Sequence, residues 1–214
     1  MKNGRYIKQI HISGYEGKIL ADIAADDIYL RHLPETYRSG RHIDAARFVM
    51  IISAFEWEFH RLYPNGIKKS DSRIAAENAV SEKIEQVIGA TSGKQREIYK
   101  FLKRLVKSDS LQSEIIQMGK DFSSIIGAFG DRLYSLNGQN LKYGEMGQRL
   151  AEQRNHFAHG DLDKEFIGLS LLDLMYMEYV IYAMQLKYYG IEERKIQKSI
   201  NELFHLNFAM QDMA

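Results

Sequence analysis

One nine-residue stretch, QRNHFAHGD at residues 153–161, concentrates side chains that could carry out acid–base and phosphate chemistry. Arg154 is always charged, and its fork of donors matches the oxygens of a phosphate group. Asn155 adds a neutral donor directly beside it. His159 would lie in the last turn of a helix, where the helix dipole favours imidazolium and a proton can be moved near neutral pH. Together these residues suit a phosphodiester whose oxygens gain charge in the transition state.

The spacing of Arg154 and His159 is weak evidence by itself, because a chain of this composition contains roughly one such arginine–histidine pair by chance. The context is more informative. Asn155 follows the arginine, and Gly160 follows the histidine where a helix would end. The residues alone leave a second interpretation open, a polar C-terminal turn with capping histidines. Comparable chance pairs in this chain are Arg5–His11 and Arg149–His156.

The elements that position this stretch are predicted to be helices. Apolar residues at three- and four-residue steps indicate a long helix over 41–63, and Ser70 or Asp71 is the predicted N-cap of the next. The apolar stripe of the first helix consists of Phe48, Ile51, Ile52, Phe55 and Phe59. The further predicted helices are 70–93, 93–107, 110–136, 143–159, 168–189 and 191–206. The fold class is therefore all-α, an antiparallel helical bundle.

Residues 1–38 differ from the rest, because their isoleucines alternate loosely and glycines separate the runs. This pattern predicts a short hairpin or extended arm, or the remnant of an upstream domain. We therefore divide the chain into an N-terminal arm, 1–38, and a helical domain, 39–214.

Composition excludes several kinds of chemistry. The chain has no cysteine, and its seven histidines show no zinc-binding spacing, so we expect no metal. Neither a phosphate-binding loop nor a dinucleotide glycine motif occurs, so we expect no cofactor. The net charge of +1 argues against bulk nucleic-acid binding and requires any such binding to use a local patch.

A membrane span is not expected. The most apolar stretch, Leu169 to Leu186, is interrupted by Asp173 and Glu178, and the N-terminus lacks the apolar core of a signal peptide. We therefore expect a cytoplasmic protein with no membrane partner.

One predicted helix, 93–107, could supply the local patch for RNA. Basic residues recur on it at steps of three and four, so they could follow the phosphates of a strand. The alternative is an ordinary solvated helix face. The basic residues are Arg96, Lys100, Lys103, Arg104 and Lys107.

The stretch RNHFAHG resembles the Arg-Asn-x3-His signature of the HEPN superfamily, all-α domains many of which are metal-independent ribonucleases. DAARFVMIISAFEWEFHRLYP, at residues 44–64, is similar to their first core helix. The nearest subgroup is the ApeA-like HEPN proteins of bacterial abortive-infection (anti-phage) defence, and the similarity spans residues 43–189. ApeA-like proteins usually carry a larger β-rich N-terminal region, so residues 1–38 resemble its edge.

The resemblance implies a role for each matching residue. Arg154 would stabilise the scissile phosphate, Asn155 would orient it, and His159 would transfer the proton. Glu56 would be a first-helix acid that supports Arg154; its alternative is an exposed partner for any basic residue. His156 is expected to face solvent or to assist in the site.

The resemblance further implies an endoribonuclease of a toxin or anti-phage system, acting on RNA such as tRNA or phage transcripts. The 2′-OH would attack the adjacent phosphate, and two protomers would share one cleft, which predicts an isologous homodimer. The helix over 168–189, with Tyr176, Tyr179 and Tyr182, could supply the interface or the core. The alternative function is a catalytically inactive HEPN module for protein association or nucleotide binding.

Overall fold

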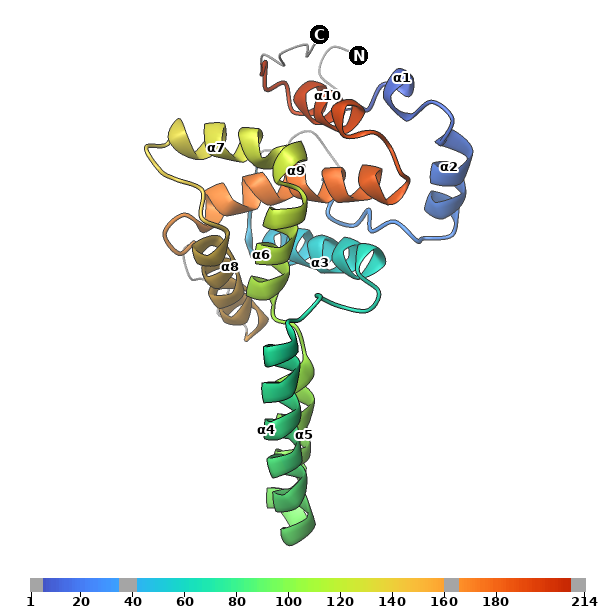
Figure 1. Ribbon diagram of the computed structural model, residues 1–214. Coiled ribbons are helices and arrows are strands. Elements are labelled where there is room, and N and C mark those ends of the chain that lie inside the picture. The colour runs from blue at the N-terminus through green and yellow to red at the C-terminus, as the bar shows by residue number, and fades with distance from the viewer. Residues whose placement is uncertain (1–5, 35–41, 160–165, 209–214) are drawn as a thin grey trace. The chain divides into compact units, whose positions relative to one another are not determined.

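The computed structural model describes residues 6–34, 42–159 and 166–208, and helices are the only regular elements in these three ranges (Figure 1). The predicted all-α class is therefore confirmed. The chain divides into two compact units, one made of residues 1–64 and 111–214 and the other of residues 65–110.

The first unit is a bundle around one central helix, α9 (Ser170–Tyr188). Helices α3 (Ala45–Leu62) and α10 (Glu193–Leu203) pack against α9 from two sides (Figure 1). Tyr176 and Tyr179 of α9 are buried, so they belong to the core of this unit. Its other elements are α1 (Gln9–Ile12), α2 (Glu16–Ala24), α6 (Leu111–Asp121), the π-helical η2 (Ser123–Gly127), α7 (Ala128–Ser135) and α8 (Tyr143–Ala158).

Helix α3 forms where its N-cap and apolar stripe predict it. The Asp44 carboxylate accepts a hydrogen bond from the backbone N–H of Arg47 at 2.8 Å, as an N-cap does. All five residues of the predicted apolar stripe are completely buried. One of them, Phe48, meets Phe157 of α8 edge-to-face with ring centroids 5.3 Å apart. The stripe therefore fixes α8 against α3.

Helices α6 and α8 approach closely through two glycines. A Cβ atom at Gly119 would lie 2.4 Å from the ring of Tyr143, and one at Gly147 would lie 2.8 Å from the Cα of Gln112. The glycines therefore serve packing. The expectation of one continuous helix over 110–136 is wrong, because η2 interrupts it between α6 and α7.

The hairpin or extended arm predicted for residues 1–38 is wrong over its described part, which contains α1 and α2. Tertiary contacts hold these short helices. His11 of α1 pairs with Glu202 of α10 at 3.0 Å, and Asp22 of α2 pairs with Arg61 of α3 at 3.1 Å. Short isoleucine-rich segments do not distinguish strand from helix by pattern, so these long-range partners decide.

The second unit is an antiparallel hairpin of α4 (Asp71–Ala90) and α5 (Gly93–Lys107), which lie side by side (Figure 1). Ser70 is the N-cap of α4, since its hydroxyl accepts the N–H of Arg73 at 3.3 Å. Ser81 and Ile88 are the buried residues of α4, and because α4 packs on α5, we infer that they mark the side of α4 that faces α5. An ion pair between Glu85 and Lys103 joins the two helices.

Candidate functional site at the end of helix α8

The QRNHFAHGD stretch forms the last turns of α8, as its composition predicts. The helix ends at Ala158, and His159 is the C-cap, with φ −87° and ψ 4°. The backbone N–H of His159 donates to the carbonyl of Asn155 at 3.1 Å, which closes the final turn. Gly160, the predicted terminating residue, lies outside the described residues.

Arg154 is held by an acid from another helix. Its Nη1 forms an ion pair with Oε1 of Glu56, which lies on α3, 98 residues earlier in the chain. The two side chains are 36% and 31% exposed, so the pair lies at the surface and within reach of a ligand. A guanidinium has five N–H donors, and one contact with Glu56 leaves others for a phosphate. This contact fits the supporting role that the family resemblance implies for Glu56, and it fits equally an exposed partner for a basic residue.

The remaining polar residues of the stretch differ in accessibility. Asn155 and His159 are exposed, and they lie four residues apart in the last turn. His156 is half-buried rather than fully exposed to solvent. Arg154, Asn155 and His159 therefore reach solvent from one helix end, together with the carboxylate of Glu56.

A buried row on the opposite side of α8 anchors this end of the helix. The side-chain oxygen of Gln153, which is completely buried, accepts the backbone N–H of Ile167 at 2.6 Å. Phe157 packs edge-to-face against Phe166 as well as Phe48. Gln153 is not among the residues predicted for the site or the core, although it lies three residues after Leu150 and four before Phe157, the spacing of a buried row.

The neighbouring arginine of α8, Arg149, stabilises the fold and does not belong to the candidate site. Its Nε and Nη2 donate to both oxygens of Asp173 at 2.8 and 2.9 Å, and Tyr134 donates to the same carboxylate. Asp173 is completely buried, so this bidentate pair satisfies its charge. These hydrogen bonds raise the pKa of Arg149, and burial raises the pKa of Tyr134. The cluster joins α7, α8 and α9.

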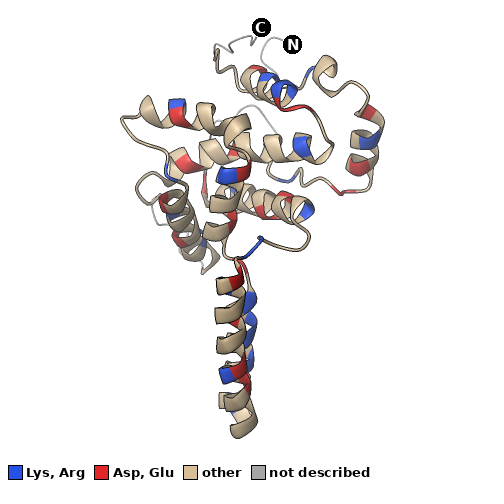
Figure 2. Ribbon diagram, viewed as in Figure 1, with Lys and Arg blue, Asp and Glu red and all other residues tan. Residues whose placement is uncertain are grey.

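The basic residues predicted to bind RNA lie on α5 of the second unit, in a row that Figure 2 shows along the hairpin. Lys103 is half-buried and paired with Glu85, and its hydrogen bond lowers the pKa of that carboxyl group. Lys103 is thus committed to the hairpin itself. The exposed members of the row are Arg96, Lys100, Arg104 and Lys107.

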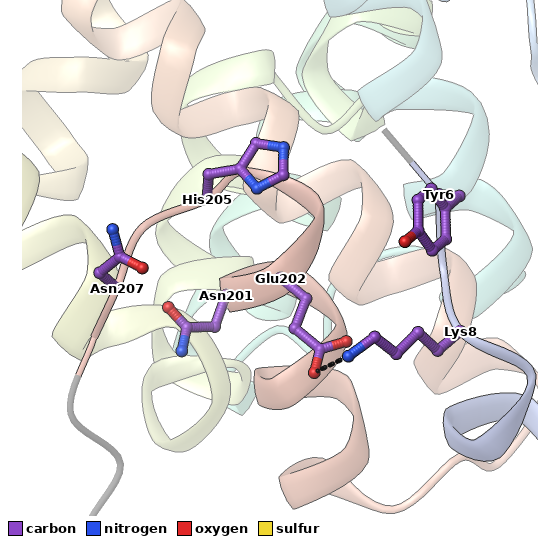
Figure 3. A pocket seen from close by; sticks show the side chains of 6 residues that line it. All are labelled: Tyr6, Lys8, Asn201, Glu202, His205 and Asn207. Carbon is purple, nitrogen blue, oxygen red and sulfur yellow. Dashed lines mark hydrogen bonds and ion pairs between the residues drawn. The ribbon is translucent and has the colours of Figure 1, made fainter. Parts of the chain in front are cut away.

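A pocket of about 290 Å³ lies between the N-terminal segment and the end of α10, and none of the predicted site residues lines it (Figure 3). Within it, Lys8 and Glu202 point toward each other and form an ion pair of 2.9 Å. Burial raises the pKa of Glu202, but hydrogen bonds from Lys8 and His11 outweigh it and leave that pKa lowered. These charges satisfy one another and join α1 to α10.

The part of the chain that the structure describes has neither a group of metal-binding side chains nor a helix that could span a membrane. Within residues 6–34, 42–159 and 166–208, no three or more histidine or acidic side chains are grouped as a metal site would require. In the same ranges, no helix has the length and apolar character to cross a bilayer.

Among known proteins, no family model, curated protein or solved structure matches the chain. The HEPN resemblance therefore rests on the sequence motif.

Proposed function

We propose that this chain is a metal-independent endoribonuclease of the HEPN type, belonging to a toxin or anti-phage defence system. The observation that carries the proposal is the ion pair between Arg154 of α8 and Glu56 of α3. It orients an accessible guanidinium at the helix end that also carries Asn155 and His159.

Each residue has a defined part in the proposed reaction. Arg154 and Asn155 would bind the scissile phosphate and stabilise the negative charge that its oxygens gain. His159, in its neutral form, would accept the proton of the 2′-OH as that oxygen attacks phosphorus. The products would be a 2′,3′-cyclic phosphate and a 5′-OH. Glu56 would act as a positioning residue, since it holds Arg154 without touching the substrate.

A dimer would complete this chemistry. Departure of the 5′-oxygen needs a proton donor, and one protomer offers one signature histidine. In a homodimer with a shared cleft, His159 of the second protomer would donate that proton. The exposed basic residues of α5 would add sequence-independent contacts to RNA phosphates. DNA would resist cleavage, because it lacks the 2′-OH.

The test is cleavage of total RNA and tRNA in the presence of EDTA, with analysis of the product ends. The wild type is expected to leave 2′,3′-cyclic phosphates. Arg154→Ala and His159→Ala are each expected to lower the rate by at least about a hundredfold, as loss of a transition-state contact or proton-transfer group does. His60→Ala is the matched control, since His60 is exposed on α3 and lies outside the proposed site.

Two outcomes would contradict the proposal. Equal cleavage by wild type, Arg154→Ala and His159→Ala would remove these residues from the active site. Absence of cleavage by the wild type on every RNA tested would favour the other function expected from the resemblance, an inactive module for protein association or nucleotide binding.

A further inference from the structure

The α4–α5 hairpin carries an apolar side that is open to solvent. Four apolar residues of α5 recur at steps of three and four, and each of them is between 40% and 58% exposed. Val80 on α4 is 45% exposed. We call the set the hairpin apolar side: Val80, Val87, Ile98, Phe101, Leu102 and Leu105.

The positions of these residues place them together on one side of the hairpin. The residues between the two helices include Ser81 of α4 and Tyr99, Lys103 and Val106 of α5, which are buried or half-buried. Val80, Ile98, Leu102 and Leu105 each directly precede one of these residues, and one residue corresponds to a rotation of about 100°. Because α4 and α5 run antiparallel, the rotation leads to the same side on both helices. Glu82, Lys100, Arg104 and Lys107 each directly follow one of the residues between the helices, so the same rotation places these charges on the other side.

The exposed area is close to what an interface needs. A side chain of this size presents on the order of 200 Å² when fully exposed, so the observed fractions leave roughly 450 Å² of apolar surface per chain. The largest apolar patch of a typical soluble monomer measures about 300 to 600 Å² and is often functional. Two copies would bury roughly 900 Å² before any polar rim is counted, which approaches the threshold of about 1,000 Å² for a specific interface.

The area that two copies would bury, and the opposite net charges of α4 and α5, favour a second copy of this chain as the occupant. Helix α4 carries four acidic and two basic residues, whereas α5 carries six basic and one acidic residue. A two-fold axis parallel to the helices places α4 of one chain over α5 of the other, so that helices of opposite net charge are neighbours. The result is a four-helix bundle with a closed apolar core.

We propose that the chain self-associates through the hairpin apolar side, with α4 of one copy packed on α5 of the other. This contact is separate from the shared cleft of the proposed ribonuclease, and its test does not depend on RNA cleavage. Sedimentation equilibrium of the full chain is expected to show self-association through the hairpin apolar side, in addition to the dimer that the shared cleft would form. Leu102→Glu would place a charge in the bundle core and is expected to weaken it on the order of a hundredfold.

The control for this experiment is Gln86→Glu, which adds the same charge at an exposed position of α4 outside the apolar side. It is expected to leave self-association unchanged, and circular dichroism of both variants establishes that the helices are retained. A monomeric wild type, or equal association of wild type and Leu102→Glu, would overturn the proposal.

Cysteine cross-linking tests the arrangement directly, because the chain contains no cysteine. Val80 and Leu105 lie at similar distances from the connection between α4 and α5. Mixing Val80→Cys with Leu105→Cys under oxidation is therefore expected to give a mixed disulfide dimer in preference to either self-dimer. A membrane surface is the competing occupant. The occupant would be lipid rather than a second copy if the wild type is monomeric and floats with phosphatidylserine vesicles. In that case Leu102→Glu would abolish the flotation.

Discussion

Acidification is expected to destabilise the protein through one buried histidine, His32. The side chain is almost completely buried, at 3% exposure, and its Nδ1 lies 2.8 Å from the carbonyl oxygen of Tyr29. Its Nε2 is buried without a hydrogen-bond partner, and Tyr182 packs edge-on against the ring. Burial lowers the pKa of His32 to about 4, the hydrogen bond to Tyr29 opposes this, and the positive charge of Arg47 reinforces it.

The size and sign of the effect follow from linkage. In the unfolded chain the pKa of His32 is 6.5, so the unfolded state binds a proton as the pH falls below that value while the folded state does not. The stability contribution is complete above pH 6.5 and is lost as the pH falls toward 4. The difference between the two pKa values corresponds to about 3 kcal/mol of stability, and about 2 kcal/mol of this stability is lost by pH 5.

Urea denaturation at pH 7.5 and pH 5.0 measures this loss, with His32→Gln as the variant that cannot titrate. The wild type is expected to lose about 2 kcal/mol more than His32→Gln between the two pH values, because all other titrating groups are common to both. His60→Gln, at an exposed position of α3, should lose as much as the wild type. Equal losses by wild type and His32→Gln would refute the assignment of the pH dependence to His32.

Four further substitutions have defined consequences. Asp173→Asn removes the charge that pairs with Arg149 and is expected to cost about 3 kcal/mol in thermal or urea unfolding; a loss below about 1 kcal/mol would contradict the importance of that pair. Gly147→Ala forces a methyl group against Gln112 and is expected to cost 1 to 3 kcal/mol, on the order seen for overpacking. Gly144→Ala, whose Cβ would lie 3.9 Å from its nearest neighbour, should be neutral or stabilising, and equal effects at both glycines would reject the packing argument. Glu56→Gln keeps a hydrogen-bonding group near Arg154 but removes the charge, and it is expected to lower RNA cleavage about tenfold; an unchanged rate would leave Glu56 without a positioning role.

The local elements could be read from the sequence because their signals lie within one or two turns of helix. The stripe from Phe48 to Phe59 repeats at helical steps, and all five of its residues are buried. Ser70 caps α4, and α8 ends at Ala158, next to the polar turn that was predicted to end it. Caps and periodicity depend on neighbouring residues alone, so no knowledge of the fold was needed.

Tertiary structure decided the features that depend on partners distant in the chain. The pairing of Glu56 with Arg154 joins residues 98 positions apart, and no local pattern distinguished Glu56 from an ordinary surface acid. The helices of the N-terminal segment are held by α3 and α10, where an isoleucine-rich sequence alone indicated a hairpin. The residue types and spacing at the end of α8 thus determined a candidate chemistry, whereas packing selected the acid that orients its arginine. Packing depends on the whole chain at once, since each buried contact must satisfy shape, charge and hydrogen bonding from two segments together.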